Sequence, residues 1–101
     1  MAMVVFKVEP AKAAALQKVT SDDTVSRQSI HTREAEALGL PGKFLYLRIQ
    51  GSDAGIAQAK RLIQEGTVGE PLPASEAERV SRAIDAEEDA AAEGMGMIFG
   101  G

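Results

Sequence analysis

A polar run between residues 24 and 33 carries the side chains of this chain that are best suited to chemistry. Five residues of this run, which supply two hydroxyls, one imidazole and two guanidinium groups, are Ser26, Arg27, Ser29, His31 and Arg33. Such groups bind anions and polar ligands, and the core of a small domain does not require their polarity. We therefore expect these residues, together with Arg48 from a later segment, to form a binding site.

Groups for catalysis and for metal binding are scarce by comparison. His31 is the only histidine and the chain has no cysteine, which excludes disulfide scaffolds, thiolate zinc sites, iron–sulfur clusters and cysteine nucleophiles. The serines lie outside any G-x-S-x-G elbow, and the glycines match neither the dinucleotide-binding pattern nor the P-loop. The sequence therefore predicts no catalytic residue, no metal ligand and no cofactor.

Carboxylates recur every four residues near the end of the chain, at Asp85, Asp89 and Glu93. Like charges at this spacing on one helix repel one another. A divalent cation or a basic partner would relieve the repulsion, although such a run is more often a solvated helix face. The sequence leaves open whether this acidic face binds a cation.

Aromatic side chains are few, and two of them share a strand face. Aromatics make up 4% of the chain, and Phe44, Tyr46 and Arg48 alternate along one segment. Sheet-based RNA-binding proteins stack bases on aromatic residues placed in this way. This chain lacks the RNP-type motif, so buried packing or self-association is the favoured interpretation of Phe44 and Tyr46.

Charge is distributed unevenly along the chain. Residues 1–52 carry seven Lys or Arg and five Asp or Glu, whereas residues 53–101 carry four and ten, which gives a net charge of −4. An acidic balance disfavours general nucleic-acid binding, which depends on clustered basic residues. We therefore predict an interaction or ligand-binding module without catalysis, and the alternative is an RNA-associated protein that uses its basic N-terminal half.

Hydrophobic periodicity and turn residues predict the elements that position these side chains. The predicted elements are a strand at 3–8, a helix at 11–19, a polar edge strand or loop at 24–32, a helical turn at 33–38, a strand at 43–50, a helix at 53–65, a linker at 66–74, a helix at 75–93 and an apolar tail at 94–101. This order predicts a single small α+β domain over residues 1–101, with a ferredoxin-like split β-α-β sheet and an additional C-terminal helix.

The strand at 43–50 directs Leu45, Leu47 and Ile49 toward the helices and leaves Phe44 and Tyr46 on the other face. Two bare aromatics are too much apolar surface for an open sheet. Either residues 75–101 fold back over this face, or a second subunit covers it. The predicted interaction surface joins Phe44 and Tyr46 to three residues of the tail, Met97, Ile98 and Phe99. A homodimer or another protein partner is expected, and the tail docks in cis or in trans.

No apolar run approaches about 18 residues, so we expect no membrane-spanning segment. The first residues, MAMVVFKVEP, lack the basic region and the long apolar region of a signal peptide. A cytoplasmic protein is therefore predicted.

Three stretches of the chain carry a resemblance to other proteins. They are Val25–Ile30 leading into Arg33–Gly39, then Tyr46–Ser52, and finally Ala90–Gly100. Together they resemble a small family of archaeal proteins of unassigned function, seen notably in methanogens. The resemblance implies a cytosolic protein, and it transfers no site residues.

Overall fold

The computed structural model describes the backbone of residues 2–100 and the side chains of residues 2–90. The strands are β1 (Ala2–Val8), β2 (Ser29–Glu34), β3 (Leu45–Gly51) and β4 (Gly69–Pro71). The α-helices are α1 (Ala13–Thr20), α2 (Asp53–Glu65) and α3 (Ala74–Gly100). Three short 3-10 helices are η1 (Pro10–Lys12), η2 (Val25–Arg27) and η3 (Glu36–Leu38).

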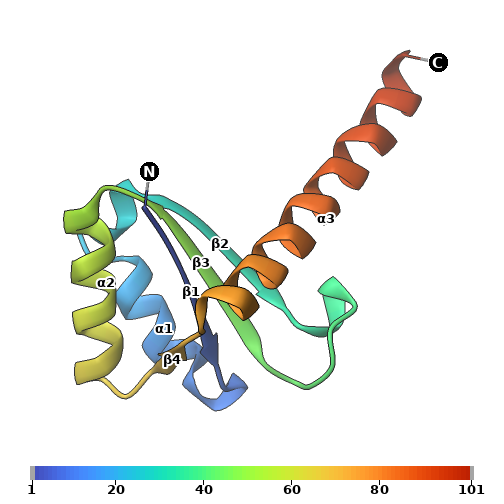
Figure 1. Cartoon of the computed structure of the whole chain (residues 1–101). Coiled ribbons are helices and arrows are strands. Elements are labelled where there is room, and N and C mark those ends of the chain that lie inside the picture. The colour runs from blue at the N-terminus through green and yellow to red at the C-terminus, as the bar shows by residue number, and fades with distance from the viewer. Residues whose placement is uncertain (1, 101) are drawn as a thin grey trace.

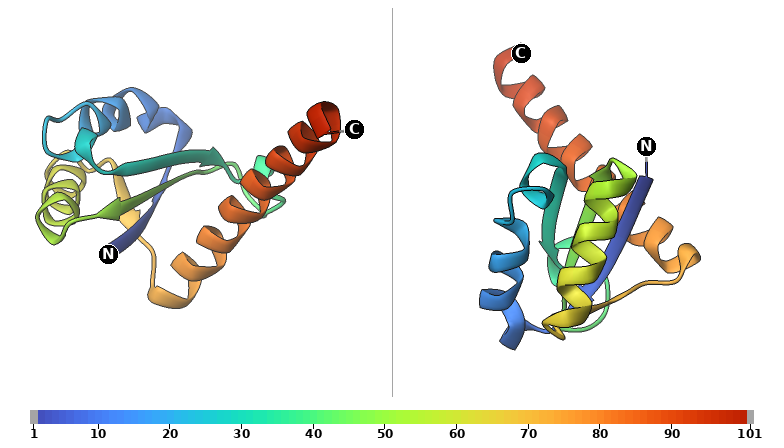
Figure 2. Two further views of the ribbon diagram at one scale, coloured as in Figure 1. Left: turned by 90° about the horizontal axis from the view of Figure 1, so that it is seen from above. Right: turned by 90° about the vertical axis from the view of Figure 1, so that its left-hand side faces the viewer.

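The four strands form one antiparallel sheet in the order β2-β3-β1-β4. Helices α1 and α2 cover one face of the sheet, and α3 crosses the opposite face before it extends away from the body (Figures 1 and 2). The chain therefore has a mixed α+β fold with a C-terminal helix, as the sequence predicts.

The face beneath α1 and α2 holds the larger apolar core. Alternate residues of β1 and β3 point into it, among them Phe6, Leu47 and Ile49, which are fully buried against α2 residues such as Ile63. The alternation predicted for the strand at 43–50 is confirmed for Leu47 and Ile49 on this face and Tyr46 on the other. Val25 also joins this core, although it belongs to η2 and not to a strand.

The opposite face holds a second apolar cluster, which packs beneath α3. Val5 and Tyr46 from the sheet contact Val80 and Ile84 of α3, and the side chain of Tyr46 is only 7% exposed. Because α3 belongs to the same chain, the prediction that the C-terminal segment folds back over Tyr46 is confirmed. No second subunit is needed to cover this aromatic ring.

Helix α2 begins at residue 53, as the sequence predicts, and a serine hydroxyl caps it. Ser52 has extended backbone dihedrals, and its Oγ accepts a hydrogen bond of 3.1 Å from the backbone N–H of Gly55. Asp53 follows in the first turn, where a negative charge is favourable.

We expect Ser52→Ala to lower the free energy of unfolding by about 1 kcal/mol, because one N–H of the first turn loses its acceptor. Urea denaturation followed by circular dichroism measures this change. Ser29→Ala is the control, since Ser29 lies exposed at the start of β2 and its loss should change stability by less than about 0.5 kcal/mol. Equal stability of the two variants would contradict a capping role for Ser52.

Several predicted boundaries differ from the structure. The edge strand or loop predicted at 24–32 contains η2 before β2 begins at Ser29, and the linker predicted at 66–74 contains β4. The helical turn predicted at 33–38 is wrong in its first part, because β2 continues through Arg33 and Glu34 and only Glu36–Leu38 forms a helical turn. The partners that hold Arg33 in the strand lie on α3, more than fifty residues away, so no local pattern indicates them. Helix α3 runs to Gly100 and not to residue 93.

In the part of the chain that the structure describes, no helix is both long enough and apolar enough to cross a membrane.

Candidate functional site

Three of the six residues predicted to bind a ligand meet on the face of the sheet beneath α3. His31 lies directly opposite Arg48 in the pairing of β2 with β3, and Arg33 lies opposite Tyr46. Their side chains meet Ser81, Asp85, Glu87 and Glu88 of α3. We call this set of seven residues the clasp, because it joins the helix to the sheet through polar contacts.

Arg48 is the buried centre of the clasp, with a side chain that is 2% exposed. Its Nη1 donates to the Ser81 carbonyl oxygen at 3.1 Å, to Ser81 Oγ at 2.8 Å and to Asp85 Oδ1 at 2.8 Å. Its Nε is buried and has no hydrogen-bond partner among the described residues. The guanidinium is therefore neutralised from one side, by a carboxylate that is itself 60% exposed.

His31 links Arg48 to a second carboxylate. Arg48 Nη2 lies 3.3 Å from His31 Nδ1, and His31 Nε2 lies 2.8 Å from Glu88 Oε1. A guanidinium can only donate, so the Arg48 contact is a hydrogen bond in the tautomer whose Nδ1 accepts. In that tautomer Nε2 carries the proton and donates it to Glu88.

Arg33 completes the clasp at the edge of the sheet. Its Nε donates to Glu87 Oε1 at 2.5 Å and its Nη2 approaches Glu88 Oε1 at 3.5 Å. Glu88 thus contacts both His31 and Arg33. Charge-assisted pairs of this kind, partly shielded from water, are stronger than pairs in open solvent.

The other three predicted binding residues are not part of the clasp, although Ser29 shares the β2 face of His31 and Arg33. Ser26 and Arg27 belong to η2, which is held by Asp22 through hydrogen bonds from the N–H groups of Thr24 and Val25. Ser26 Oγ donates to a backbone carbonyl of the same turn, and Arg27 pairs with Asp23 in open solvent. Ser29 is exposed at the start of β2. The structure therefore does not join Ser26 and Arg27 to the clasp, and ligand binding by these six residues stays a prediction.

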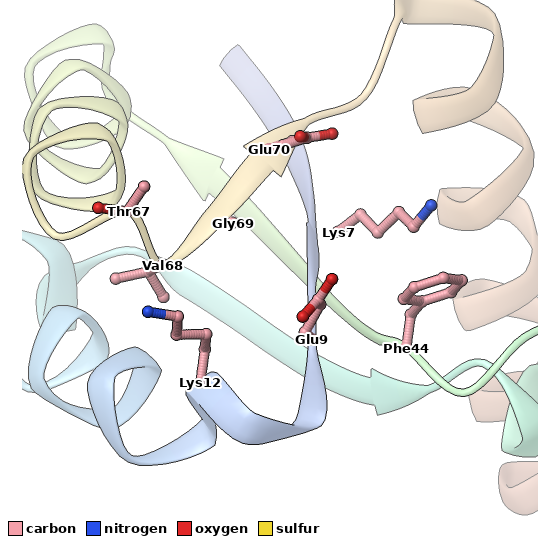
Figure 3. Close-up of a pocket in the computed structure, with 8 residues that line it drawn as sticks. All are labelled: Lys7, Glu9, Lys12, Phe44, Thr67, Val68, Gly69 and Glu70. Carbon is pink, nitrogen blue, oxygen red and sulfur yellow. The ribbon is translucent and has the colours of Figure 1, made fainter.

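Phe44 separates from Tyr46 and lines a different feature. It precedes β3, and the ammonium group of Lys7 lies 3.9 Å from the centre of its ring. Here the surface forms a cleft of about 460 Å³ beside β1 and β4 (Figure 3). Charges of both signs surround the cleft, from Lys7, Lys12, Glu9 and Glu70. The cleft has no clear preference for an anionic or a cationic ligand.

The clasp is built to hold α3 in place. Both ring nitrogens of His31 contact other residues of the clasp. None of the clasp residues lines the 460 Å³ cleft. The geometry supports a structural junction between helix and sheet.

The acidic residues of α3 have separate surroundings. Asp85 pairs with Arg48 of the sheet, so the basic partner that the sequence leaves open lies, for this residue, in the same chain. Asp89 is exposed, and the side chain of Glu93 lies outside the described residues. Among residues whose side chains are described, no group of three His, Cys, Asp or Glu is arranged to hold a metal ion.

Sequence reasoning missed Ser81, Glu87 and Glu88 as partners of the basic residues. The signal was present, because Ser81, Asp85 and Glu88 are spaced i, i+4 and i+7 and therefore share one face of a helix with Ile84. The spacing of four that singles out Asp89 and Glu93 starts from the same Asp85, but it passes over Glu87 and Glu88. The side chains of Met97, Ile98 and Phe99 lie beyond the part of α3 whose side chains are described.

Comparison with protein-family models, with curated proteins and with solved structures finds no match to this chain. The resemblance to an archaeal family therefore stays a prediction.

Proposed function

We propose that this chain is a protein-interaction module without catalysis of its own, and that its partner is a second copy bound through residues 91–100 of α3. The proposal includes a ferredoxin-like scaffold, which is supported by the strand order β2-β3-β1-β4 and by two helices on one face of the sheet. The scaffold holds α3 in position, and residues 91–100 of α3 contact the second copy.

The observation that carries this proposal is the unequal anchoring of α3. Among described side chains, the contacts that join the helix to the sheet end at Glu87 and Glu88. The helix then continues to Gly100, beyond the edge of the sheet (Figure 1). The molecule is accordingly elongated, with extents of 49 × 28 × 26 Å.

The residue types in the projecting turns also favour a contact with a second copy. Gly94 and Gly96 are poor helix formers, and short helical segments without tertiary packing are marginal in water. The same turns contain Met95, Met97, Ile98 and Phe99, and flexible methionine suits adaptable apolar contacts. Packing against a second copy would supply the stabilisation that helical propensity does not.

RNA binding is supported less well. Stacking of bases requires an exposed aromatic ring, and Tyr46 is covered by α3. Arg33 and Arg48 are paired with carboxylates of the same chain, which occupy the positions that phosphates would need. Salt-dependent retention on RNA tests the alternative, and a salt slope near zero is expected.

We expect deletion of residues 91–101 to convert a dimer to a monomer while the free energy of unfolding of the folded unit changes little. The clasp and the apolar cluster beneath α3 lie entirely before residue 91, so the deletion leaves them intact. Sedimentation equilibrium measures the molecular mass, and urea denaturation of the monomer measures stability.

A full-length Ile98→Ser/Phe99→Ser variant is the matched control for chain length, and it should dissociate as the deletion does. A parent chain that remains monomeric at every accessible concentration would contradict the proposal. A deletion variant that stays dimeric would show that residues 91–101 are not the contact.

A further inference from the structure

The sheet has two outer strands, and they differ in their readiness to accept another strand. β4 has three residues and ends at Pro71, which has no N–H to donate. β2 has six residues and no proline, and it pairs on one side only, with β3. A strand of this length with one unpaired edge is a template for pairing with another chain.

We propose that β2 pairs in antiparallel fashion with β2 of a second copy, so that the two sheets join into one. The inference deepens the self-association proposed above and rests on it, because it names a second surface of the same dimer. A two-fold axis makes such an interface self-complementary, and the occupant of the edge is then the same six residues.

The alternation of hydrogen-bonded and non-bonded residues along β2 identifies the backbone groups that are free to pair with a second strand. The N–H of Ala35 donates to the carbonyl of Phe44 at 2.9 Å, which continues the register that pairs Arg33 with Tyr46 and His31 with Arg48. Hydrogen-bonded and non-bonded pairs alternate along an antiparallel ladder. Ile30, Thr32 and Glu34 therefore direct their N–H and C=O groups away from β3.

One position of the two-fold axis lets all of these N–H and C=O groups form hydrogen bonds with the second copy. With the axis at Thr32, this residue faces Thr32 of the second copy, and Ile30 faces Glu34 of the second copy. Opposed threonines are a favourable cross-strand pair. An axis at Arg33 would instead place two guanidinium groups opposite each other, which is unfavourable. We therefore assign the axis to Thr32.

The surroundings of the edge leave room for a second strand. Thr32 and Glu34 are exposed. A hollow of about 280 Å³, lined by Thr32 together with residues of α1, separates that helix from the strand. The carbonyl of Thr32 accepts a hydrogen bond of 2.9 Å from Nη1 of its neighbour Arg33. Pairing would replace this side-chain donor with a backbone N–H of the second copy.

The direction of α3 agrees with this arrangement. The helix crosses the face opposite to α1 and α2 and continues outward (Figure 2). A two-fold axis perpendicular to the joined sheet places both α3 helices on the same face with opposite directions. The projecting turns of α3 and the paired β2 edges would then contribute to the same dimer.

A single-cysteine variant tests the pairing directly, because the chain has no cysteine of its own. In the assigned register, the two copies of residue 32 lie about 5.5 Å apart at Cα, within the range that a disulfide spans. Thr32→Cys should therefore form a covalent dimer under mild oxidation. The control is Ser75→Cys at the start of α3, beside the other edge, which should remain largely monomeric on non-reducing gels.

Thr32→Pro separates this inference from the proposed function. The N–H of Thr32 points away from β3, so proline at this position leaves the internal ladder intact and removes a donor from the outer edge. We expect a folded monomer by circular dichroism and sedimentation. A Thr32→Pro variant that stays dimeric, while deletion of residues 91–101 gives a monomer, overturns the strand pairing and leaves the proposed function standing.

The reverse result, a monomer with Thr32→Pro and a dimer after the deletion, supports the strand pairing and overturns the role of residues 91–100. If Thr32→Pro unfolds, the Thr32→Cys variant decides. Failure of Thr32→Cys to cross-link under conditions in which the parent is dimeric overturns the pairing, and a monomeric parent overturns both proposals.

Discussion

Ile84→Ala should lower the free energy of unfolding by about 3 kcal/mol, because it deletes a fully buried side chain where α3 contacts the sheet. This loss is a large part of the stability of a small domain, which is typically about 5–15 kcal/mol. Urea denaturation followed by circular dichroism measures it. The same variant should loosen α3 locally, because Ile84 is the last large apolar residue of the cluster along the helix.

Tyrosine fluorescence separates local loosening from global destabilisation. The chain has one tyrosine and no tryptophan, so its intrinsic emission comes from Tyr46 alone. We expect acrylamide to quench Tyr46 more strongly in Ile84→Ala than in the parent. The control, Ile63→Ala, removes a buried side chain from α2 on the other face, so it should lose similar stability with unchanged quenching. Equal quenching in both variants would contradict the packing of Ile84 over Tyr46.

Asp85→Ala should cost about 2 kcal/mol, whereas Arg48→Met should cost less, although both substitutions break the same ion pair. The first leaves the buried guanidinium of Arg48 without its carboxylate, and an uncompensated buried charge is strongly destabilising. Because Asp85 is more than half exposed, water compensates in part, and the expected loss is below the usual range for buried pairs. The second replaces the charge with an apolar chain of similar length, which is often nearly neutral.

A double variant measures the coupling between Arg48 and Asp85. Arg48→Met/Asp85→Ala should be as stable as Arg48→Met alone, because the carboxylate has nothing left to neutralise. The exposed pair Arg82–Glu78 on the same helix provides the control. Glu78→Ala should cost less than about 0.5 kcal/mol, as is usual for surface pairs. Additive losses from Arg48→Met and Asp85→Ala would contradict the coupling.

Local sequence patterns are sufficient to predict the elements that have a strong hydrophobic periodicity of their own. Strict alternation in β3 and the cap at Ser52 before α2 place these elements to within a few residues, and β1 follows from its β-branched residues. The fold-back of α3 was predictable for a different reason. Tyr46 needed a cover, and the chain carried one more amphipathic helix.

The clasp was harder to predict because its contacts join residues far apart in sequence. The sequence predicts a ligand-binding site at the basic residues and favours a solvated helix face for the acidic run, so it does not pair the two groups. The crossing of α3 over the sheet decides which carboxylate meets which cation, and no local pattern contains that geometry. Ser26 and Arg27 were grouped with His31 by sequence proximity, but the turn at Asp22 directs them elsewhere.

The position of α3 over β1 also has a consequence for biosynthesis. Val5 emerges from the ribosome well before Val80 and Ile84, which cover it. The strands and the helices α1 and α2 are all complete by residue 71, so the face beneath α1 and α2 can close first. Until α3 is synthesised, the ribosome-bound intermediate leaves the apolar face around Val5 and Tyr46 uncovered.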